Sequence, residues 1–122
     1  MTIRILYVDD EADIREVAAM SLELDPELEV RTCASGAEAL EQAGEWRPDL
    51  ILLDVMMPGM DGPTVFTHLR EDPATATIPV VFITARTQAY EVRAFHDLGA
   101  RGVLAKPFDP MSLSIRVREF IE

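Results

Sequence analysis

The sequence predicts a doubly wound α/β domain, in which helices cover both faces of a five-stranded parallel sheet. Two observations lead to this prediction. Five short apolar runs of strand length alternate with five segments whose apolar residues recur at helical spacing. A helix between consecutive strands is also the crossover that parallel strands require. With 122 residues, and with no repeat or linker, residues 1–122 are expected to form one domain.

The elements of the first half follow from branched apolar runs and from helix signals. A run rich in Ile, Leu and Val predicts the first strand at residues 3–8, and the helix after it is ended by an Asp-Pro pair. The second strand is predicted at residues 28–33. Ser35 and Glu38 then have the spacing of a capping box, so a second helix is predicted to begin beside them.

The second half continues the alternation. Gly62-Pro63 predicts the start of a third helix, because proline suits the first helical turn. A fourth helix is predicted at about residues 87–98, and Asp109-Pro110 predicts the N-cap and first turn of a fifth. The remaining strands are predicted at residues 50–53, 80–83 and 103–105.

Composition and charge exclude several classes of function. Eleven basic against 22 acidic residues give a net charge of −11, which repels phosphate backbones and anionic lipids, so no direct contact with nucleic acid or membrane is expected. The apolar stretches fall far short of the roughly twenty residues that span a bilayer. Cys33 has no second cysteine to pair with and no signal peptide opens the chain, so a cytoplasmic location is expected.

Polar residues stand at the carboxyl ends of four predicted strands. Asp9 and Asp10 follow the first strand, Asp54 the third, Thr84 the fourth and Lys106 the fifth. In doubly wound sheets the functional crevice lies beyond these ends. Three carboxylates, a hydroxyl and an ammonium are therefore predicted to converge.

Such a cluster of carboxylates predicts a bound cation, because like charges at close range are unfavourable. Oxygen donors favour Mg²⁺, which binds one or two carboxylates and keeps waters and a phosphate oxygen. His68 and His96 lie in separate helical patterns and are expected at the surface, as is Trp46. A carboxylate nucleophile, Mg²⁺, a hydroxyl and a lysine are the groups that phosphoryl transfer uses, with an aspartyl phosphate as product.

Four segments together carry a resemblance to a known family. In order and spacing they resemble the receiver domain of two-component response regulators over the whole chain, and the chemotaxis regulators of one domain in particular. The segments are Val8-Asp9-Asp10-Glu11, Leu53-Asp54-Val55-Met56-Met57-Pro58-Gly59-Met60-Asp61-Gly62, Ile83-Thr84-Ala85 and Lys106-Pro107-Phe108. The resemblance implies a flavodoxin-like fold with strand order 2-1-3-4-5.

The resemblance also implies roles for the site residues. Asp54 corresponds to the phosphoacceptor, Thr84 to the hydroxyl that bonds the phosphoryl group, and Lys106 to the ammonium that pairs with it, through a cis Lys106-Pro107 peptide. The implied Mg²⁺ ligands are Asp9, Asp10, Asp54 and the main-chain carbonyl of Met56.

Partners are implied by the same resemblance. The phosphoryl donor would be a sensor histidine kinase or a histidine phosphotransfer protein, and the output would be contact with a further protein. Such a domain assists only its own phosphorylation and dephosphorylation and is not an enzyme acting on other substrates. A monomer is expected, because the basic pairs of dimerising receivers are not evident on the last helix.

Three positions depart from the commoner family pattern. Val103 stands where many receivers have an aromatic residue that turns inward, and a branched valine cannot make that movement. Activation is therefore expected to act through residues 84–87 and the following helix. Met56 and Arg86 stand where the family modulates hydrolysis of the phosphoryl group, and this pair predicts a long-lived phosphorylated state.

Other interpretations remain open at this point. Asp9 and Asp10 are also compatible with an acidic first helical turn, Thr84 with a cap and Lys106 with a solvated loop. A Mg²⁺-dependent phosphohydrolase would need a carboxylate two residues beyond its nucleophile, a spacing that Asp9 and Glu11 have. A scaffold module that keeps the pocket without phosphorylation is a third interpretation.

Overall fold

The five strands form one parallel sheet in the order β2-β1-β3-β4-β5. A computed structural model describes residues 2–121 of the chain. The strands are β1 (Ile3–Val8), β2 (Leu28–Cys33), β3 (Leu50–Asp54), β4 (Val80–Thr84) and β5 (Gly102–Ala105). The helices are α1 (Ala12–Leu22), α2 (Gly36–Trp46), α3 (Gly62–Glu71), α4 (Ala89–Leu98) and α5 (Leu113–Ile121).

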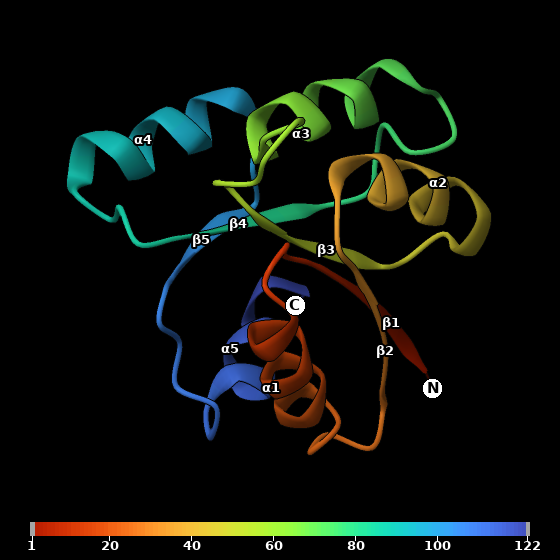
Figure 1. Ribbon diagram of the computed structural model, residues 1–122, viewed down its shortest axis with the longest axis vertical. Helices are drawn as coiled ribbons and strands as arrows, with labels where there is room; N and C mark the ends of the chain where they lie inside the picture. Colours follow the sequence, from red (N-terminus) through yellow and green to blue (C-terminus); the bar gives the residue numbers. More distant parts are fainter. Residues whose placement is uncertain (1, 122) are drawn as a thin grey trace.

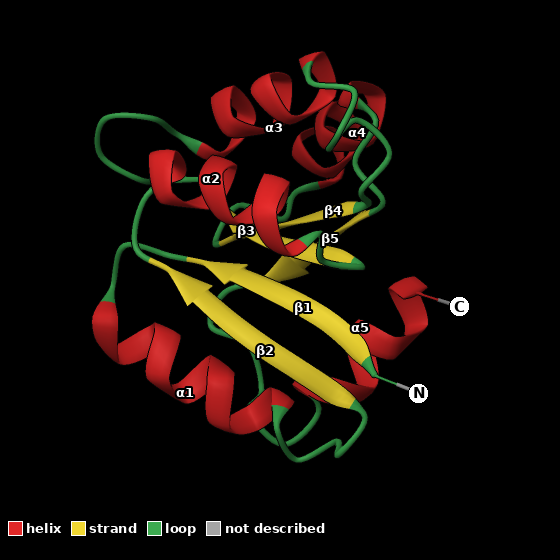
Figure 2. Ribbon diagram, turned by 90° about the vertical axis from the view of Figure 1, so that its right-hand side faces the viewer, coloured by secondary structure: helices red, strands yellow, loops and turns green. Residues whose placement is uncertain are grey.

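Helices cover both faces of this sheet. Figure 1 shows α1 and α5 below the sheet and α2, α3 and α4 above it, and the turned view in Figure 2 shows the same division. The arrangement confirms the predicted doubly wound, flavodoxin-like fold and its strand order.

Two apolar cores lie on the two faces, because neighbouring residues of a strand point to opposite sides. Ile5 and Tyr7 of β1 pack into the core between the sheet and helices α1 and α5. Leu6 and Val8 pack into the core between the sheet and helices α2, α3 and α4. Every residue of β3 and β4 is buried. Burial on both faces explains why these strands have continuous apolar runs instead of alternating patterns.

Side chains fix the starts of two helices, and one of these caps, at Ser35, was predicted. Ser35 is the N-cap of α2, and its hydroxyl accepts a hydrogen bond of 3.2 Å from the Glu38 backbone N–H. Asp61 caps α3 in the same way, accepting from Thr64 N at 2.9 Å. A cap of this kind satisfies one of the free N–H groups of a first turn. The α3 cap holds that helix directly after the loop that follows Asp54.

The start of the last helix differs from the prediction. The α-helix begins at Leu113, not beside Asp109-Pro110. The Asp109 side chain accepts from Met111 N at 2.9 Å, and its carbonyl accepts from Ser112 N at 3.1 Å, so a turn forms first. Asp followed by Pro suits the first two positions of a β-turn as well as a helix start.

Trp46 was expected at the surface, and this expectation is wrong. Only 6% of the residue is exposed. The guanidinium carbons of Arg4 and Arg31 lie 5.6 and 4.7 Å from the ring centroid, and Arg4 Nη1 also donates to the Trp46 carbonyl. Two arginines from β1 and β2 thus cover an aromatic ring at the end of α2. His68 and His96 are exposed, as expected.

Cys33 is buried at the end of β2. Burial, and then the charge of Glu38 and a hydrogen bond with it, raise the pKa of the thiol to about 12. Among the helices of residues 2–121, none combines the length and the apolar character needed to cross a membrane.

Candidate functional site

The predicted site residues meet at one edge of the sheet. Asp54 and Thr84 are the last residues of β3 and β4, Asp9 follows β1 directly, and Lys106 follows β5. Register aligns the strand ends, since Asp54 pairs with Ile83 and Thr84 with Ala105. Parallel pairing therefore brings together residues that are up to 97 positions apart in the chain.

The ammonium of Lys106 lies at the centre of the cluster. Its Nζ donates to Asp9 Oδ2 at 3.1 Å, to Glu11 Oε1 at 3.4 Å and to Asp54 Oδ2 at 3.5 Å. The lysine side chain is 18% exposed. One positive charge is thus shared by three carboxylates.

Asp9 is fully buried and its acceptor atoms are used by several donors. Oδ2 accepts from the Tyr7 hydroxyl at 3.1 Å in addition to Lys106, and Oδ1 accepts from the backbone N–H of Glu11 at 3.0 Å. Arg15 donates to the main-chain carbonyl of Asp9 at 2.8 Å. These contacts fix the orientation of the Asp9 carboxylate.

Asp9, Asp10 and Asp54 form a group that fits a divalent cation. One carboxylate oxygen from each lies within 4.8 Å of the other two. Asp9 and Asp54 are buried and Asp10 is exposed, so the group opens toward solvent on one side. Donors that are all carboxylate oxygens suit a hard ion such as Mg²⁺. The donor chemistry of these residues therefore agrees with the predicted metal.

Burial and charge shift the pKa of the two central groups. Burial, reinforced by the negative charge of Asp9, raises the pKa of Asp54 to about 6, although Lys106 acts in the opposite direction. For Lys106, burial acts to lower the pKa, but the hydrogen bond with Asp9 and the charge of Asp54 outweigh it and the pKa is raised. Asp54 is therefore ionised above about pH 6 while Lys106 stays charged.

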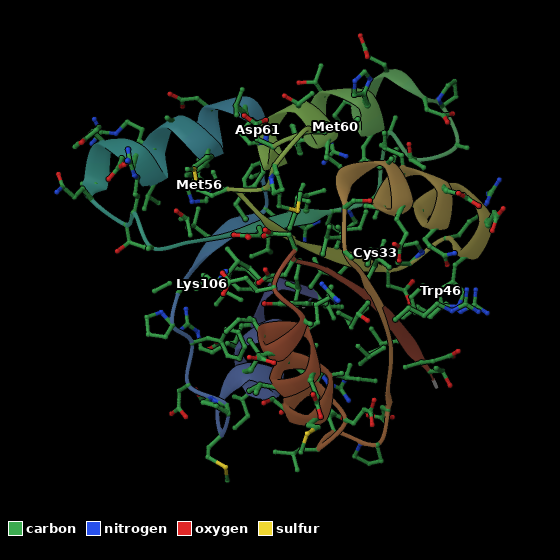
Figure 3. All side chains as sticks on the ribbon, viewed as in Figure 1. Cys33, Trp46, Met56, Met60, Asp61 and Lys106 are labelled. Atoms are coloured by element: carbon green, nitrogen blue, oxygen red, sulfur yellow. The ribbon has the colours of Figure 1, made fainter. Side chains whose placement is uncertain are left out.

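A cavity of about 560 Å³ opens beside Asp54. Glu11, Thr84 and Lys106 line it together with apolar residues, namely Ile14, Val17, Met56, Ala85, Pro107, Phe108 and Pro110. Figure 3 shows Met56 and Lys106 on one side of the molecule and Trp46 on the opposite side. The Lys106-Pro107 peptide is cis, as expected. A reacting group could approach Asp54 through this cavity.

Thr84 and Arg86 lie at the start of the chain that joins β4 to α4. The Thr84 hydroxyl accepts a hydrogen bond of 3.0 Å from the Arg86 backbone N–H. The Arg86 side chain is mostly exposed and its Nη1 lies 4.0 Å from Glu91 Oε2. Because of the bond to Arg86, Thr84 points its hydroxyl toward its own loop while it also lines the cavity.

Val103 of β5 pairs with Phe82 of β4.

Tyr7 and Arg15 are site contacts that sequence reasoning missed. Tyr7 is an aromatic residue in a mostly aliphatic strand, two residues before Asp9, a spacing that puts both side chains on one face of β1. An aromatic hydroxyl in a buried strand needs a polar partner, and this signal could have identified the contact. Arg15 gave no such signal, because its target is a main-chain carbonyl.

Known proteins resemble this chain closely. The family model of the response regulator receiver domain matches residues 5–118. The response regulator PleD of Caulobacter vibrioides is 48% identical over 120 residues, which are 97% of this chain and 26% of PleD. The DNA-binding response regulator MtrA of Mycobacterium tuberculosis is 39% identical over 115 residues, which are 94% of this chain and 49% of MtrA. The chain thus spans between a quarter and a half of these relatives.

Solved structures agree with the sequence relatives. The chemotaxis response regulator CheY4 of Vibrio cholerae matches with a TM-score of 0.89 and 32% identity, covering 98% of this chain and 99% of that one. A response regulator of Chloroflexus aurantiacus matches with a TM-score of 0.88 and 36% identity, covering 99% and 98% of the two chains. The family match over nearly all of the sequence and the shared fold lead to one conclusion: this chain belongs to the family of response regulator receiver domains.

Proposed function

We propose that this chain is a phosphorylation-dependent signalling switch that accepts a phosphoryl group on Asp54. The donor would be a sensor histidine kinase or a histidine phosphotransfer protein, and the output would be contact with a downstream protein. Family membership supports a signalling role of this kind. The choice of Asp54 rests on the site geometry described above.

The observation that carries the proposal is that Asp54 contacts the ammonium of Lys106 and also lines a cavity. Its Oδ2 lies 3.5 Å from Lys106 Nζ, and the residue lines the 560 Å³ cavity. Asp9 and Asp10 lie beside it, but Asp9 is fully buried and is not among the residues that line the cavity. An incoming phosphoryl group in the cavity would therefore meet Asp54 rather than Asp9.

The transfer step is a displacement at phosphorus. An oxygen of the ionised Asp54 carboxylate forms the new P–O bond while the N–P bond of a phosphohistidine breaks. The electron pair of that bond returns to the imidazole of the donor, which takes up a proton. Although burial raises the pKa of Asp54, the value of about 6 still lies below neutral pH, so the ionised carboxylate is available as a nucleophile there.

Asp9, Asp10, Asp54 and the main-chain carbonyl of Met56 would hold Mg²⁺. When bound, the ion neutralises charge on the phosphoryl oxygens during the transfer. Lys106 would pair with a second phosphoryl oxygen, for which its ammonium must leave Asp9 or Glu11. The Thr84 hydroxyl would donate a hydrogen bond to a third oxygen.

The arrangement of Glu11 weakens the phosphohydrolase interpretation. In that interpretation Asp9 would be the nucleophile and Glu11 the acid and base. Both oxygens of Asp9 already accept hydrogen bonds, and Glu11 lies 3.4 Å from Lys106 Nζ. A carboxylate that is held by three donors is a poor nucleophile, because its lone pairs are engaged. The geometry therefore favours Asp54 as the acceptor.

The test is an intact-mass measurement after incubation with acetyl phosphate, with and without Mg²⁺. The wild type is expected to gain one phosphoryl group only when Mg²⁺ is present, and Asp54→Asn is expected to gain none. Asp97→Asn, an equal change at an exposed position of α4, serves as the matched control and should be phosphorylated normally.

Other outcomes would replace the proposal. Catalytic release of phosphate without a lasting adduct, retained in Asp54→Asn, would support the hydrolase. The absence of both adduct and turnover would support a scaffold module. If an adduct forms, incubation with phosphorylated histidine phosphotransfer domains would next identify the class of donor.

A further inference from the structure

Tyr7 lies in the core of the domain and bonds to the cluster of carboxylates. The residue is fully buried in β1, and its hydroxyl donates to Asp9 Oδ2 at 3.1 Å. Its ring stands edge-on to Phe108, with centroids 6.4 Å apart and planes at 75°. Phe108 directly follows the Lys106-Pro107 pair. The Tyr7 side chain is thus confined by packing, so that its hydroxyl has a fixed position beside Asp9.

The hydrogen bonds of Asp9 leave little of its acceptor capacity free. An ionised carboxylate has about four acceptor sites, two on each oxygen. Tyr7 and Lys106 occupy both sites on Oδ2, since each donates to it at 3.1 Å. The Glu11 backbone N–H occupies one site on Oδ1, at 3.0 Å. A single site on Oδ1 therefore remains for a further partner.

We propose that Tyr7 is a positioning residue for the divalent cation, acting through Asp9. Its hydroxyl holds Oδ2 on the buried side of the carboxylate, and this orientation directs the remaining site on Oδ1 toward the group formed with Asp10 and Asp54. The inference rests on the proposed function, because it concerns the same Mg²⁺ site. It adds a residue that is not itself a ligand.

Loss of the hydroxyl would act on Asp9 in two ways. Oδ2 would be left with Lys106 as its only donor, so the carboxylate could turn with the lysine side chain. Without competition from Tyr7, the ion pair between Lys106 and Asp9 would also become stronger, and this would keep a positive charge closer to the cation site. Both effects weaken cation binding. Substitution of residues that orient metal ligands typically lowers affinity roughly 10- to 100-fold.

A purely structural role for Tyr7 predicts a different result. A buried tyrosine hydroxyl needs some acceptor, and Asp9 could serve only to satisfy it. In that case removal of the hydroxyl would lower stability without changing the affinity for the cation. Stability and affinity must therefore be measured separately on the same variant.

The experiment is an NMR titration of the protein with Mg²⁺ alone, together with thermal unfolding. Tyr7→Phe keeps the ring and its contact with Phe108 but removes the hydroxyl. Thr75→Val is the matched control, because it removes another buried hydroxyl, which donates to the Leu69 carbonyl at 2.7 Å in the loop before β4. Tyr7→Phe is expected to raise the Kd for Mg²⁺ about tenfold. Thr75→Val is expected to lower Tm and to leave Kd unchanged.

Equal Kd values for Tyr7→Phe and the wild type would overturn the inference. Should Tyr7→Phe fail to fold, the Tyr7 hydroxyl proton of the wild type provides a second test. Its resonance is expected to shift when Mg²⁺ is added, because the ion withdraws electron density from Asp9, and an unchanged resonance would contradict the positioning role.

The same samples separate this inference from the proposed function. If the wild type binds Mg²⁺ and is phosphorylated on Asp54 while Tyr7→Phe has the wild-type Kd, only the role of Tyr7 is wrong. If the wild type neither binds Mg²⁺ nor forms an adduct, the proposed function fails, and the inference fails with it.

Discussion

A methyl group on Gly62 would lie 2.6 Å from the main-chain oxygen of Asp54. The first residue of α3 therefore packs directly against the backbone that follows β3. The Gly62 N–H also donates to the Val55 carbonyl at 2.9 Å, which closes the loop between them. The helix start and the site residue are thus fixed to each other through the main chain.

The contact predicts that Gly62→Ala displaces Asp54. Backbone atoms cannot give way as a flexible side chain can, so overpacking should destabilise the fold by about 1–3 kcal/mol. Phosphorylation by acetyl phosphate should also be slower. Denaturant unfolding and intact mass measure the two effects. Gly44→Ala is the control, because a methyl group there meets nothing within 4 Å in α2, and it should increase stability. Wild-type behaviour of Gly62→Ala would show that the loop adapts freely.

Asp54→Asn is expected to stabilise the metal-free protein at neutral pH. The pKa of Asp54 is raised from 3.8 to about 6, so its contribution to stability is present below pH 3.8 and is lost as the pH rises through 6. Asparagine avoids this loss, which is on the order of 3 kcal/mol at pH 7. Thermal unfolding between pH 4 and pH 8 tests this.

Two results would accompany that gain in stability. The advantage of Asp54→Asn should vanish near pH 4 and should shrink when Mg²⁺ is added to the wild type, because the ion compensates the buried charge. A pH-independent difference between the two proteins would mean that ionisation of Asp54 is not its cause.

Arg118 is expected to fix the C-terminal helix to the loop before β2. Its Nε donates to Asp25 Oδ2 at 2.8 Å, its Nη2 donates to Oδ1 at 3.3 Å, and Nη2 also contacts Glu27. Arg118→Gln should lower Tm at neutral pH. Arg116→Gln, which removes an exposed pair with Glu119 within α5, should have little effect.

The pH dependence of that effect can be derived from Asp25. The hydrogen bond from Arg118, with a smaller one from the Glu27 backbone, lowers the pKa of Asp25 below its usual 3.8. The stabilisation is therefore present above pH 3.8 and is lost as the pH falls through the lowered pKa. Unfolding curves for both variants should converge in strong acid, and a constant gap would contradict this account.

The lifetime of the phosphorylated state depends, in our hypothesis, on Met56 and Arg86. Met56 is exposed on the cavity wall and cannot hold a water molecule in line with the phosphoryl group. Met56→Asn combined with Arg86→Glu should shorten the lifetime several-fold, as measured by loss of the adduct mass over time. Met20→Asn, an equal change at another exposed methionine, should leave the decay rate unchanged, and so would the double variant if the hypothesis is wrong.

Activation is expected to move the chain between β4 and α4. The Thr84 hydroxyl accepts from Arg86 N at 3.0 Å, and this bond must rearrange when Thr84 turns to a phosphoryl group. No residue of α4 is fully buried, and Phe95 packs against Phe82 with ring centroids 4.8 Å apart, so a shift of this helix must carry or repack that contact. NMR spectra with beryllofluoride should change across residues 84–90. Unchanged signals there, together with changes at Val103, would refute this route.

The sheet and the convergence of the site could be predicted because both follow from local patterns. Continuous apolar runs identify buried parallel strands, and parallel pairing places every strand end at the same edge. Asp54, Thr84 and Lys106 were found in this way without any knowledge of their partners. Caps are equally local, and Ser35 formed the predicted contact with Glu38.

The remaining contacts depend on which residues meet only in the folded chain. Arg4 and Arg31 cover Trp46 from two strands, Arg4 being 42 positions away, and no local pattern indicates that pairing. The predicted start of α5 was wrong for another reason. Asp109-Pro110 fits both a turn and a helix start, and the sequence around it does not decide between them. The contact between Tyr7 and Asp9 could have been predicted from the hydroxyl of a tyrosine in a buried strand, but it was not.

The buried thiol of Cys33 at the end of β2 can be used to measure local opening of the fold. A raised pKa near 12 leaves almost none of Cys33 as the reactive thiolate at neutral pH, and burial keeps reagents from it. Alkylation therefore proceeds only through molecules in which β2, at the edge of the sheet, has come away from the core. Because no other cysteine competes for the label, the alkylation rate divided by that of an unprotected thiol gives the population of the open form when reclosing is faster than labelling.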